Sequence, residues 1–137
     1  MKRAMLIAVM CAFLASCAGL GDWSYKLPNG YEVQHINSDR ILITYARSEI
    51  DAEGIPSFIK EFSYDDRYVF SKNSEDIKGN KVSDEVYYAL DTIERRVYGP
   101  FNNIEELTEK ADEWNVELPS EWYSTSSDPS NINNKDK

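Results

Sequence analysis

Few side chains in this sequence could act as nucleophiles, general bases or metal ligands. His35 is the single histidine, and the only cysteines are Cys11 and Cys17. One histidine cannot supply the imidazoles of a multi-histidine metal site. A Ser-His-Asp triad would have to use His35, yet the chain contains no G-x-S-x-G sequence. We therefore interpret His35 as a partly buried strand residue with a hydrogen-bond partner, and predict no catalytic residue, metal site or cofactor.

Carboxylates are abundant, with 24 Asp and Glu against 15 Lys and Arg, and two segments concentrate them. Asp65 and Asp66 fall at a predicted hairpin tip, where a carboxylate pair could act in catalysis or hold a cation. Asp side chains in turns more commonly accept hydrogen bonds from nearby backbone amides. The second segment carries oxygen ligands suited to calcium, namely Glu75, Asp76, Asn80, Asp84 and Glu85. Its spacing fails the EF-hand pattern, so cation binding between Asn73 and Glu85 stays an open alternative.

Aromatic side chains are more numerous than one sheet face and one helix need, with nine Tyr, three Trp and five Phe. Exposed tyrosines on a sheet often form interfaces or sugar-stacking platforms, because they bury a large area at low entropy cost. The candidates for such an interaction surface lie on two predicted hairpins: Tyr64, Tyr68, Tyr87, Tyr88 and Tyr98. Packing in the core or on the sheet surface is the alternative. Glycine-rich phosphate loops and basic stripes are absent from the sequence, so we predict no nucleic-acid partner.

The first residues have the organisation of an export signal. Lys2 and Arg3 precede an apolar run, residues 4–14, that is too short to span a bilayer core of about 30 Å as a lasting helix. Residues 14–17 read Leu-Ala-Ser-Cys, which resembles the lipobox of bacterial lipoproteins. In that class the Cys thiol, here Cys17, forms a thioether to diacylglycerol and becomes the first residue of the mature chain. Two or three acyl chains such as palmitate, at about 0.8 kcal/mol per buried methylene, anchor a protein durably.

Cleavage before Cys17 would leave an acidic chain without a free thiol. Cys11 would be removed and Cys17 would carry the lipid, so no disulfide could form. The removed residues include Lys2 and Arg3 but no acid, which leaves 13 basic against 24 acidic residues, a net charge of −11. Such a chain repels nucleic acid and anionic lipid. The two residues after Cys17 are Ala18 and Gly19, so the sequence lacks the Asp signal typical of inner-membrane retention. The expected location is the outer membrane, or the outer face of the cytoplasmic membrane in a cell with one membrane.

The chain divides into four parts. Residues 1–16 are the predicted signal peptide and residues 17–22 a short lipid-anchored tether. Residues 23–123 suit one β-rich globular domain. Residues 124–137 are rich in Ser, Asn and Asp with one large apolar residue, which predicts a disordered polar tail.

Apolar residues in the domain recur mostly with period two and are rich in Tyr, Phe, Val and Ile, which favours strands. Residues 28–30 and 37–40 are turn segments, so the first three strands form a meander. Tight hairpins are expected around residues 65–67 and 92–94. The charged connection from Asn73 to Asp84 is expected to be the longest and most mobile loop. The predicted strands are 23–27, 31–36, 41–46, 57–64, 68–72, 85–91 and 95–99.

The period changes after Pro100. Apolar residues then follow at spacings of three and four, which predicts an amphipathic helix. Asn102 or Asn103 can cap its N-terminus, and Glu105 and Glu106 lie in the first turn, where the helix dipole favours anions. The spaced apolar residues are Phe101, Ile104, Leu107, Ala111 and Trp114. The predicted fold is therefore α+β, mainly an antiparallel β-sheet meander with one C-terminal amphipathic helix packed on a face. Leu118 and Trp122 are expected to pack back on that helix.

The order of these segments resembles a family of small bacterial lipoproteins known as domain of unknown function 3997. The resemblance rests on residues 17–33 (CAGLGDWSYKLPNGYEV), 61–70 (EFSYDDRYVF) and 87–101 (YYALDTIERRVYGPF), and extends from Cys17 to about Trp114. The family supplies no activity, cofactor or catalytic residue to transfer.

Three functions are compatible with these features. The leading hypothesis is a non-enzymatic binding or protein-interaction module at the cell envelope, which a flat aromatic patch would favour. The alternative is an envelope carbohydrate-acting enzyme with a carboxylate pair, which a concave cleft with two carboxyls about 5 to 9.5 Å apart would favour. The third is a structural envelope component with weak cation affinity.

Overall fold

The computed structural model describes residues 22–45, 55–76 and 78–129. The predicted signal peptide, Cys17 and most of the tether lie outside these residues. Within them, no helix has both the length and the apolar character needed to cross a membrane.

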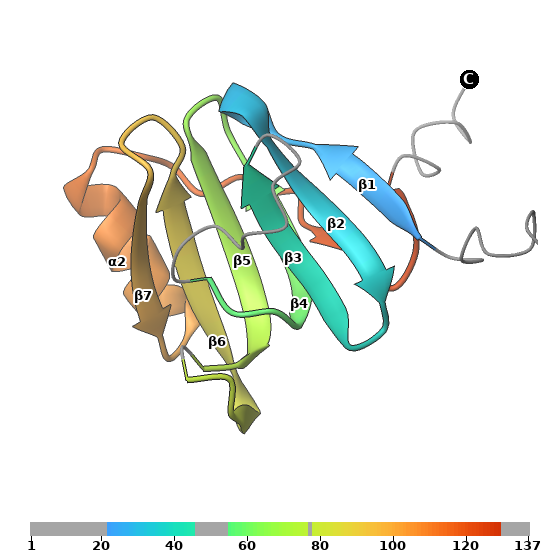
Figure 1. Ribbon diagram of the computed structural model, residues 1–137. Coiled ribbons are helices and arrows are strands. Elements are labelled where there is room, and N and C mark those ends of the chain that lie inside the picture. The colour runs from blue at the N-terminus through green and yellow to red at the C-terminus, as the bar shows by residue number, and fades with distance from the viewer. Residues whose placement is uncertain (1–21, 46–54, 77, 130–137) are drawn as a thin grey trace, which may run out of the picture.

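Two antiparallel sheets make up most of the domain (Figure 1). The small sheet has the order β1-β2-β3, and the 3-10 turn η2 (Pro28–Gly30) links its first two strands: β1 (Trp23–Lys26), β2 (Tyr31–Asn37) and β3 (Arg40–Tyr45). The large sheet has the order β7-β6-β5-β4-β8, with β4 (Ile59–Tyr64), β5 (Tyr68–Glu75), β6 (Lys81–Asp91), β7 (Arg96–Phe101) and β8 (Tyr123–Ser124). The predicted meander and both hairpins are confirmed.

The large sheet is covered on both faces. One face packs against the small sheet, so that Val33 and Ile43 share a core with Phe62 and Leu90. The opposite face carries the helix α2 (Ile104–Glu113), whose buried Leu107 packs with other apolar residues of that face. The molecule therefore has three layers, with the large sheet between the small sheet and α2 (Figure 1). This arrangement confirms the α+β class with a C-terminal helix.

The helix begins where the sequence places its cap. The Asn103 side chain accepts a hydrogen bond from the Glu106 backbone N–H at 2.9 Å, and the Glu106 carboxylate accepts one from the Asn102 N–H at 2.8 Å. These reciprocal bonds satisfy amides that have no partner inside a helix. The bonds from Asn102 also lower the pKa of the Glu106 carboxyl. Leu118 and Trp122 lie partly buried against the cluster that contains Leu107, as expected.

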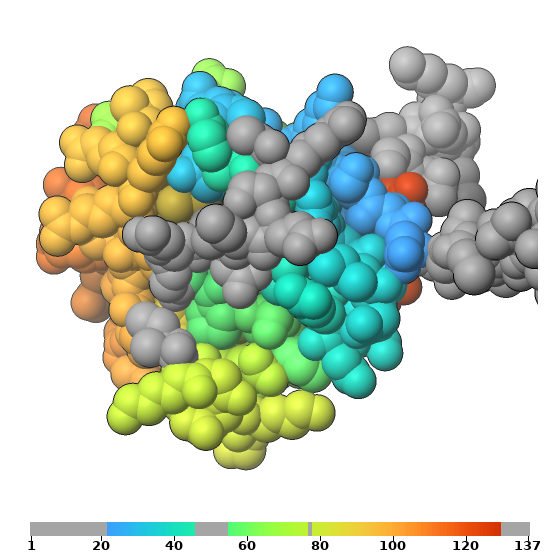
Figure 2. Space-filling view, in the orientation of Figure 1, coloured from blue at the N-terminus to red at the C-terminus, as the bar shows by residue number. Residues whose placement is uncertain are grey.

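The connection after β5 is shorter than predicted. β5 continues to Glu75 and β6 already begins at Lys81, so residues 76–80 alone separate them. Asn73, predicted to start a mobile loop, is fully buried in β5. The expectation of a loop from Asn73 to Asp84 is wrong because the hairpin stem extends beyond the apolar part of its strands. The end of this hairpin projects from one end of the molecule (Figure 2).

The polar tail also begins later than predicted. Ser124 lies in β8 and pairs with Glu61 of β4. Thr125 is only 3% exposed, and its hydroxyl donates to the Ile59 carbonyl at 2.6 Å. A disordered tail starting at Ser124 is therefore wrong for these two residues, because their backbone and hydroxyls complete the edge of β4. Residues 130–137 lie outside the described residues.

Candidate functional site

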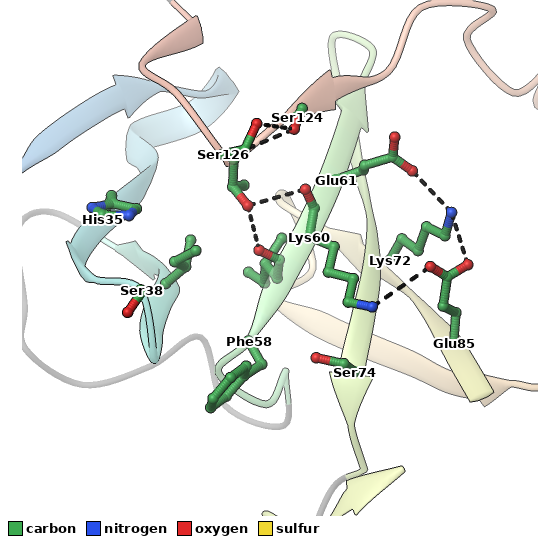
Figure 3. Close-up of a pocket in the computed structure, with 13 residues that line it drawn as sticks. His35, Ser38, Phe58, Lys60, Glu61, Lys72, Ser74, Glu85, Ser124 and Ser126 are labelled. Carbon is green, nitrogen blue, oxygen red and sulfur yellow. Dashed lines mark hydrogen bonds and ion pairs between the residues drawn. The ribbon is translucent and has the colours of Figure 1, made fainter. Parts of the chain in front are cut away.

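A groove of about 620 Å³ lies where β4 begins, and we call it the β4 groove. The β2–β3 hairpin contributes His35 and Ser38 on one side, and the large sheet contributes Lys72 and Glu85 on the other (Figure 3). Segments that are far apart in sequence form its remaining walls: Phe58–Glu61 at the start of β4, and Ser124–Ser126 at the end of the described chain. A groove of this volume falls in the size range of small-ligand sites.

Four ionised side chains form a network on one wall of the groove. Lys72 Nζ lies 3.1 Å from Glu61 Oε2 and 2.8 Å from Glu85 Oε2, and Lys60 Nζ lies 3.7 Å from Glu85 Oε1. Lys60 and Glu61 are consecutive, and consecutive strand residues normally point to opposite faces. The register of β4 against β5 shifts between Ile59 and Glu61, which marks a β-bulge. This bulge allows both side chains to reach the same network.

The network keeps Lys72 and Glu85 charged. The hydrogen bond between Lys72 and Glu85 is the main cause of two opposite shifts: it raises the pKa of the Lys72 ammonium and lowers the pKa of the Glu85 carboxyl. Both shifts favour the ionised forms. The network as a whole joins two lysines to two glutamates, so their formal charges sum to zero.

Phe58 enters the groove from a strained backbone conformation. Its φ is +71°, a value that a bulky side chain rarely adopts. The Ser74 N–H donates to the Phe58 carbonyl at 3.2 Å. Buried Asn73 donates to the Pro56 carbonyl at 2.7 Å and accepts from the Ser71 hydroxyl at 2.7 Å. These bonds anchor the segment before β4 and hold Phe58 at the groove.

His35 lines the groove from β2 as a half-buried strand residue. Its ring stacks on Trp23 of β1, with centroids 5.2 Å apart and planes 18° from parallel. Its buried Nδ1 has no hydrogen-bond partner among the described residues, where the sequence led us to expect one. Stacking on Trp23, the first residue of the first strand, places the start of the domain beside the groove.

The five tyrosines predicted as an interaction surface do not share one exposed face, although Tyr64, Tyr87 and Tyr98 are partly exposed. Tyr88 is fully buried and Tyr68 is 8% exposed, so both expectations of an exposed ring are wrong. Tyr64 packs with the core between the sheets, whereas Tyr87 and Tyr98 pack on the helix side of the large sheet. The prediction failed because both faces of this sheet are covered, so that its aromatic residues serve two cores.

Tyr64 belongs to a packed aromatic cluster at the edge of the sandwich. The Tyr25 and Tyr64 hydroxyls lie 2.8 Å apart, and both rings contact Tyr123 with centroids 5.6 and 5.9 Å away. Burial, and then the hydrogen bond with Tyr64, raise the pKa of Tyr25. The rings occupy the space that a stacked ligand would need, so this cluster closes the core.

The predicted carboxylate groups serve turns and ion pairs. Asp65 Oδ1 accepts from the backbone amides of Arg67 and Tyr68 at 2.8 and 2.6 Å, as expected of a turn residue. Asp76 Oδ1 likewise accepts from the Lys78 and Asn80 amides, and the Asn80 bond is the main cause of its lowered pKa. In the described ranges no group of three His, Cys, Asp or Glu residues is arranged to hold a metal ion.

Sequence reasoning missed the residues that build the groove. The sequence pattern predicts Lys72 only as the last residue of a strand, and Lys60 and Glu61 only as residues within one. The available signal was the interruption of apolar strands by adjacent charges of opposite sign. Phe58 carried no signal, since its positive φ depends on bonds made by residues of another strand.

The fold and the site define a class of protein: a two-sheet α+β domain with an ion-lined groove. Residues 28–120 match the family described as "Protein of unknown function (DUF3997)", and the chain belongs to this family. The resemblance to domain of unknown function 3997 is thus confirmed. The match extends from η2 past α2 and includes His35, Phe58 and the ion network, but not Trp23 or Ser124–Ser126. No curated protein and no solved structure matches the chain.

Proposed function

We propose that this protein is an exported lipoprotein, anchored through a lipid on Cys17, whose domain is a non-enzymatic binding or protein-interaction module at the cell envelope. The lipobox sequence at residues 14–17 supports the anchor. The β4 groove supports the binding role, and the ion network that lines it is the observation that carries the proposal. Fixed, mutually paired charges preorganise a binding surface, because little side-chain freedom remains to be lost when a ligand arrives.

One observation favours the alternative, an envelope carbohydrate-acting enzyme: Glu61 and Glu85 share a concave groove. Hydrolysis by two carboxylates requires one of them to hold a proton near neutral pH, which needs a raised pKa. Lys72 lies between the two groups and lowers the pKa of Glu85. The same ammonium occupies the position between the carboxylates where a glycosidic oxygen would have to lie. These features support binding over hydrolysis.

The anchor would hold the groove close to the membrane. Trp23 follows Cys17 by six residues, whose fully extended length is about 20 Å. Trp23 stacks on His35, and His35 lines the groove. The binding partner of the proposed module is therefore confined to the layer next to the lipid headgroups, whether it is a membrane protein or another surface component.

Crosslinking in intact cells tests this proposal. The full-length protein and a Cys17→Ala variant are expressed at equal levels, and labelling with an alkynyl palmitate reports lipidation. We expect label and membrane association in the parent alone, with a dominant crosslinked species that is lost in the variant. A labelled parent that shows no crosslinked species above background would contradict the interaction role. An unlabelled parent would contradict the anchor.

A further inference from the structure

We infer that the β4 groove binds an uncharged glycan, a ligand whose polar groups are hydroxyls and amides without net charge. This inference rests on the proposed binding function and gives it a ligand class. Three features of the groove support it: its charge balance, the satisfied backbone at its edge, and the side chains that remain for contact.

The charge balance selects against an ionic ligand. Lys60 and Lys72 are matched by Glu61 and Glu85 within the network itself, at the nitrogen–oxygen distances given above. A ligand with a net charge of either sign would compete with an existing ion pair and meet a like charge beside it. A hydroxyl can instead donate to a carboxylate oxygen or accept from an ammonium group while the pairs stay intact.

The backbone at the groove selects against an extended peptide. Peptides that join a sheet edge gain affinity from main-chain hydrogen bonds. The Ile59 and Lys60 carbonyls of β4 already accept bonds from Thr125, and the Phe58 carbonyl accepts from the Ser74 amide. These acceptors are therefore occupied. Recognition in the groove must come from side chains, as in a carbohydrate site.

The side chains that remain suit a polyhydroxyl ligand. Ser124 and Ser126 hydroxyls lie 2.8 Å apart at one edge, and Ser38 and Ser74 line the groove as well. Figure 3 shows these hydroxyls at several places around the ion network of the groove, with Phe58 at the opposite border from Ser126. The Phe58 ring, which also has the Lys81 ammonium 4.8 Å from its centroid, can contact the apolar C–H face of a sugar while the hydroxyls and carboxylates bind the sugar's hydroxyls.

The test measures binding of neutral tetrasaccharides to the full-length protein by isothermal titration calorimetry. The protein is held in lipid nanodiscs, because the headgroups of glucoside and maltoside detergents are themselves neutral sugars. The probes are chitotetraose, cellotetraose, maltotetraose and mannotetraose, each titrated to about 10 mM, a range that detects weak sites. Tetragalacturonate serves as the anionic counterpart.

Phe58→Gly is the decisive variant. Glycine adopts a φ of +71° without strain, so the change removes the ring while the backbone conformation stays favourable. We expect at least one neutral tetrasaccharide to bind, an affinity about tenfold lower in Phe58→Gly, and no response to tetragalacturonate. Ile93→Ser is the matched control. Ile93 is 63% exposed and lies in the turn between β6 and β7, so this variant is expected to bind like the parent.

Each other outcome overturns the inference. Equal affinity in Phe58→Gly would move the glycan site away from the groove, and binding of tetragalacturonate alone would show that the ligand is charged. Failure of all four neutral probes would reject the ligand class. If crosslinking in intact cells still recovers a membrane-proximal protein in that case, the proposed binding module stands and only its glycan ligand is rejected.

Discussion

The two ends of the sandwich contain the same kinds of charged residue in opposite surroundings. At the β4 groove, Glu85 has a side chain 42% exposed and bonds to lysine ammonium groups. At the other end, Asp91 has a side chain 2% exposed and accepts from Arg67 and from the backbone amides of Ile93 and Glu94. The difference shows that one end uses charge to fix its turns, and the other leaves charge accessible to a ligand.

The Asp91 end also joins the two sheets. Asn29, in the turn before β2, donates to the Thr92 hydroxyl at 2.8 Å and to the Asp66 carbonyl at 3.1 Å. The Thr92 hydroxyl in turn donates to the Arg67 carbonyl. Turns from both sheets are thus tied together through side chains at this end. Disrupting it is expected to affect stability, whereas disrupting the groove is expected to affect binding.

The largest effect is expected for Asp91→Ala. The substitution removes the partner of Arg67 and leaves the Ile93 and Glu94 amides unsatisfied, which costs about 3 kcal/mol of unfolding free energy. Urea unfolding followed by tryptophan fluorescence measures it. Glu94→Gln is the matched control, because Glu94 is exposed and lies 3.6 Å from Arg67. If Asp91→Ala lowers the free energy of unfolding no more than Glu94→Gln does, the buried carboxylate does not stabilise the fold.

The second effect is expected for Asn73→Ala at the groove end. The Pro56 carbonyl and the Ser71 hydroxyl would lose a buried partner, which costs about 2 kcal/mol. The segment that carries Phe58 would also lose its anchor. Ser74→Ala, at the next residue of β5, is the control for a substitution in this strand. Its urea midpoint should stay close to that of the parent. Equal midpoints in both variants would contradict the anchoring role.

A pH dependence separates the two ends further. Burial acts to raise the pKa of Asp91, but hydrogen bonds from Arg67 and the Glu94 and Ile93 amides outweigh it and hold the pKa below its usual value. A carboxyl with a lowered folded-state pKa stabilises the fold above its unfolded pKa and loses that contribution as pH falls through the folded value. The stability difference between parent and Asp91→Asn should therefore be constant near neutral pH and shrink below about pH 4. A difference that persists unchanged in acid would contradict this linkage.

The smallest effect is expected for Lys72→Met. The Lys72 side chain is 21% exposed and its partners are more exposed still; ion pairs at such partly exposed sites contribute about 1 kcal/mol, so the urea midpoint should change less than in the two variants above. The two carboxylates would then lack their shared ammonium, and any ligand of the groove should bind less well. A large loss of stability without a change in binding would reverse the roles assigned to the two ends.

Much of the fold could be predicted because its signals are local. The alternation of apolar and polar residues predicts most of the strands. Asn103, a capping residue followed three positions later by Glu106, predicts the start of α2. Tyr88 was misjudged because its burial depends on the small sheet covering that face, which no local pattern records. Asn73 and Thr125 are polar residues whose burial depends on partners in distant strands. The groove could not be predicted for the same reason, since it joins five separate segments.

Thr125 also determines when the chain can finish folding. Its bonds to the Ile59 and Lys60 carbonyls join residues more than sixty positions apart, and β8 reaches the edge of β4 only after α2 and the segment behind it have been synthesised. The ribosome must therefore have released the chain through Thr125 before β8 can join the large sheet. Until then the edge of β4 that receives β8 has no strand partner, so the order of synthesis makes this edge the last part of the large sheet to close.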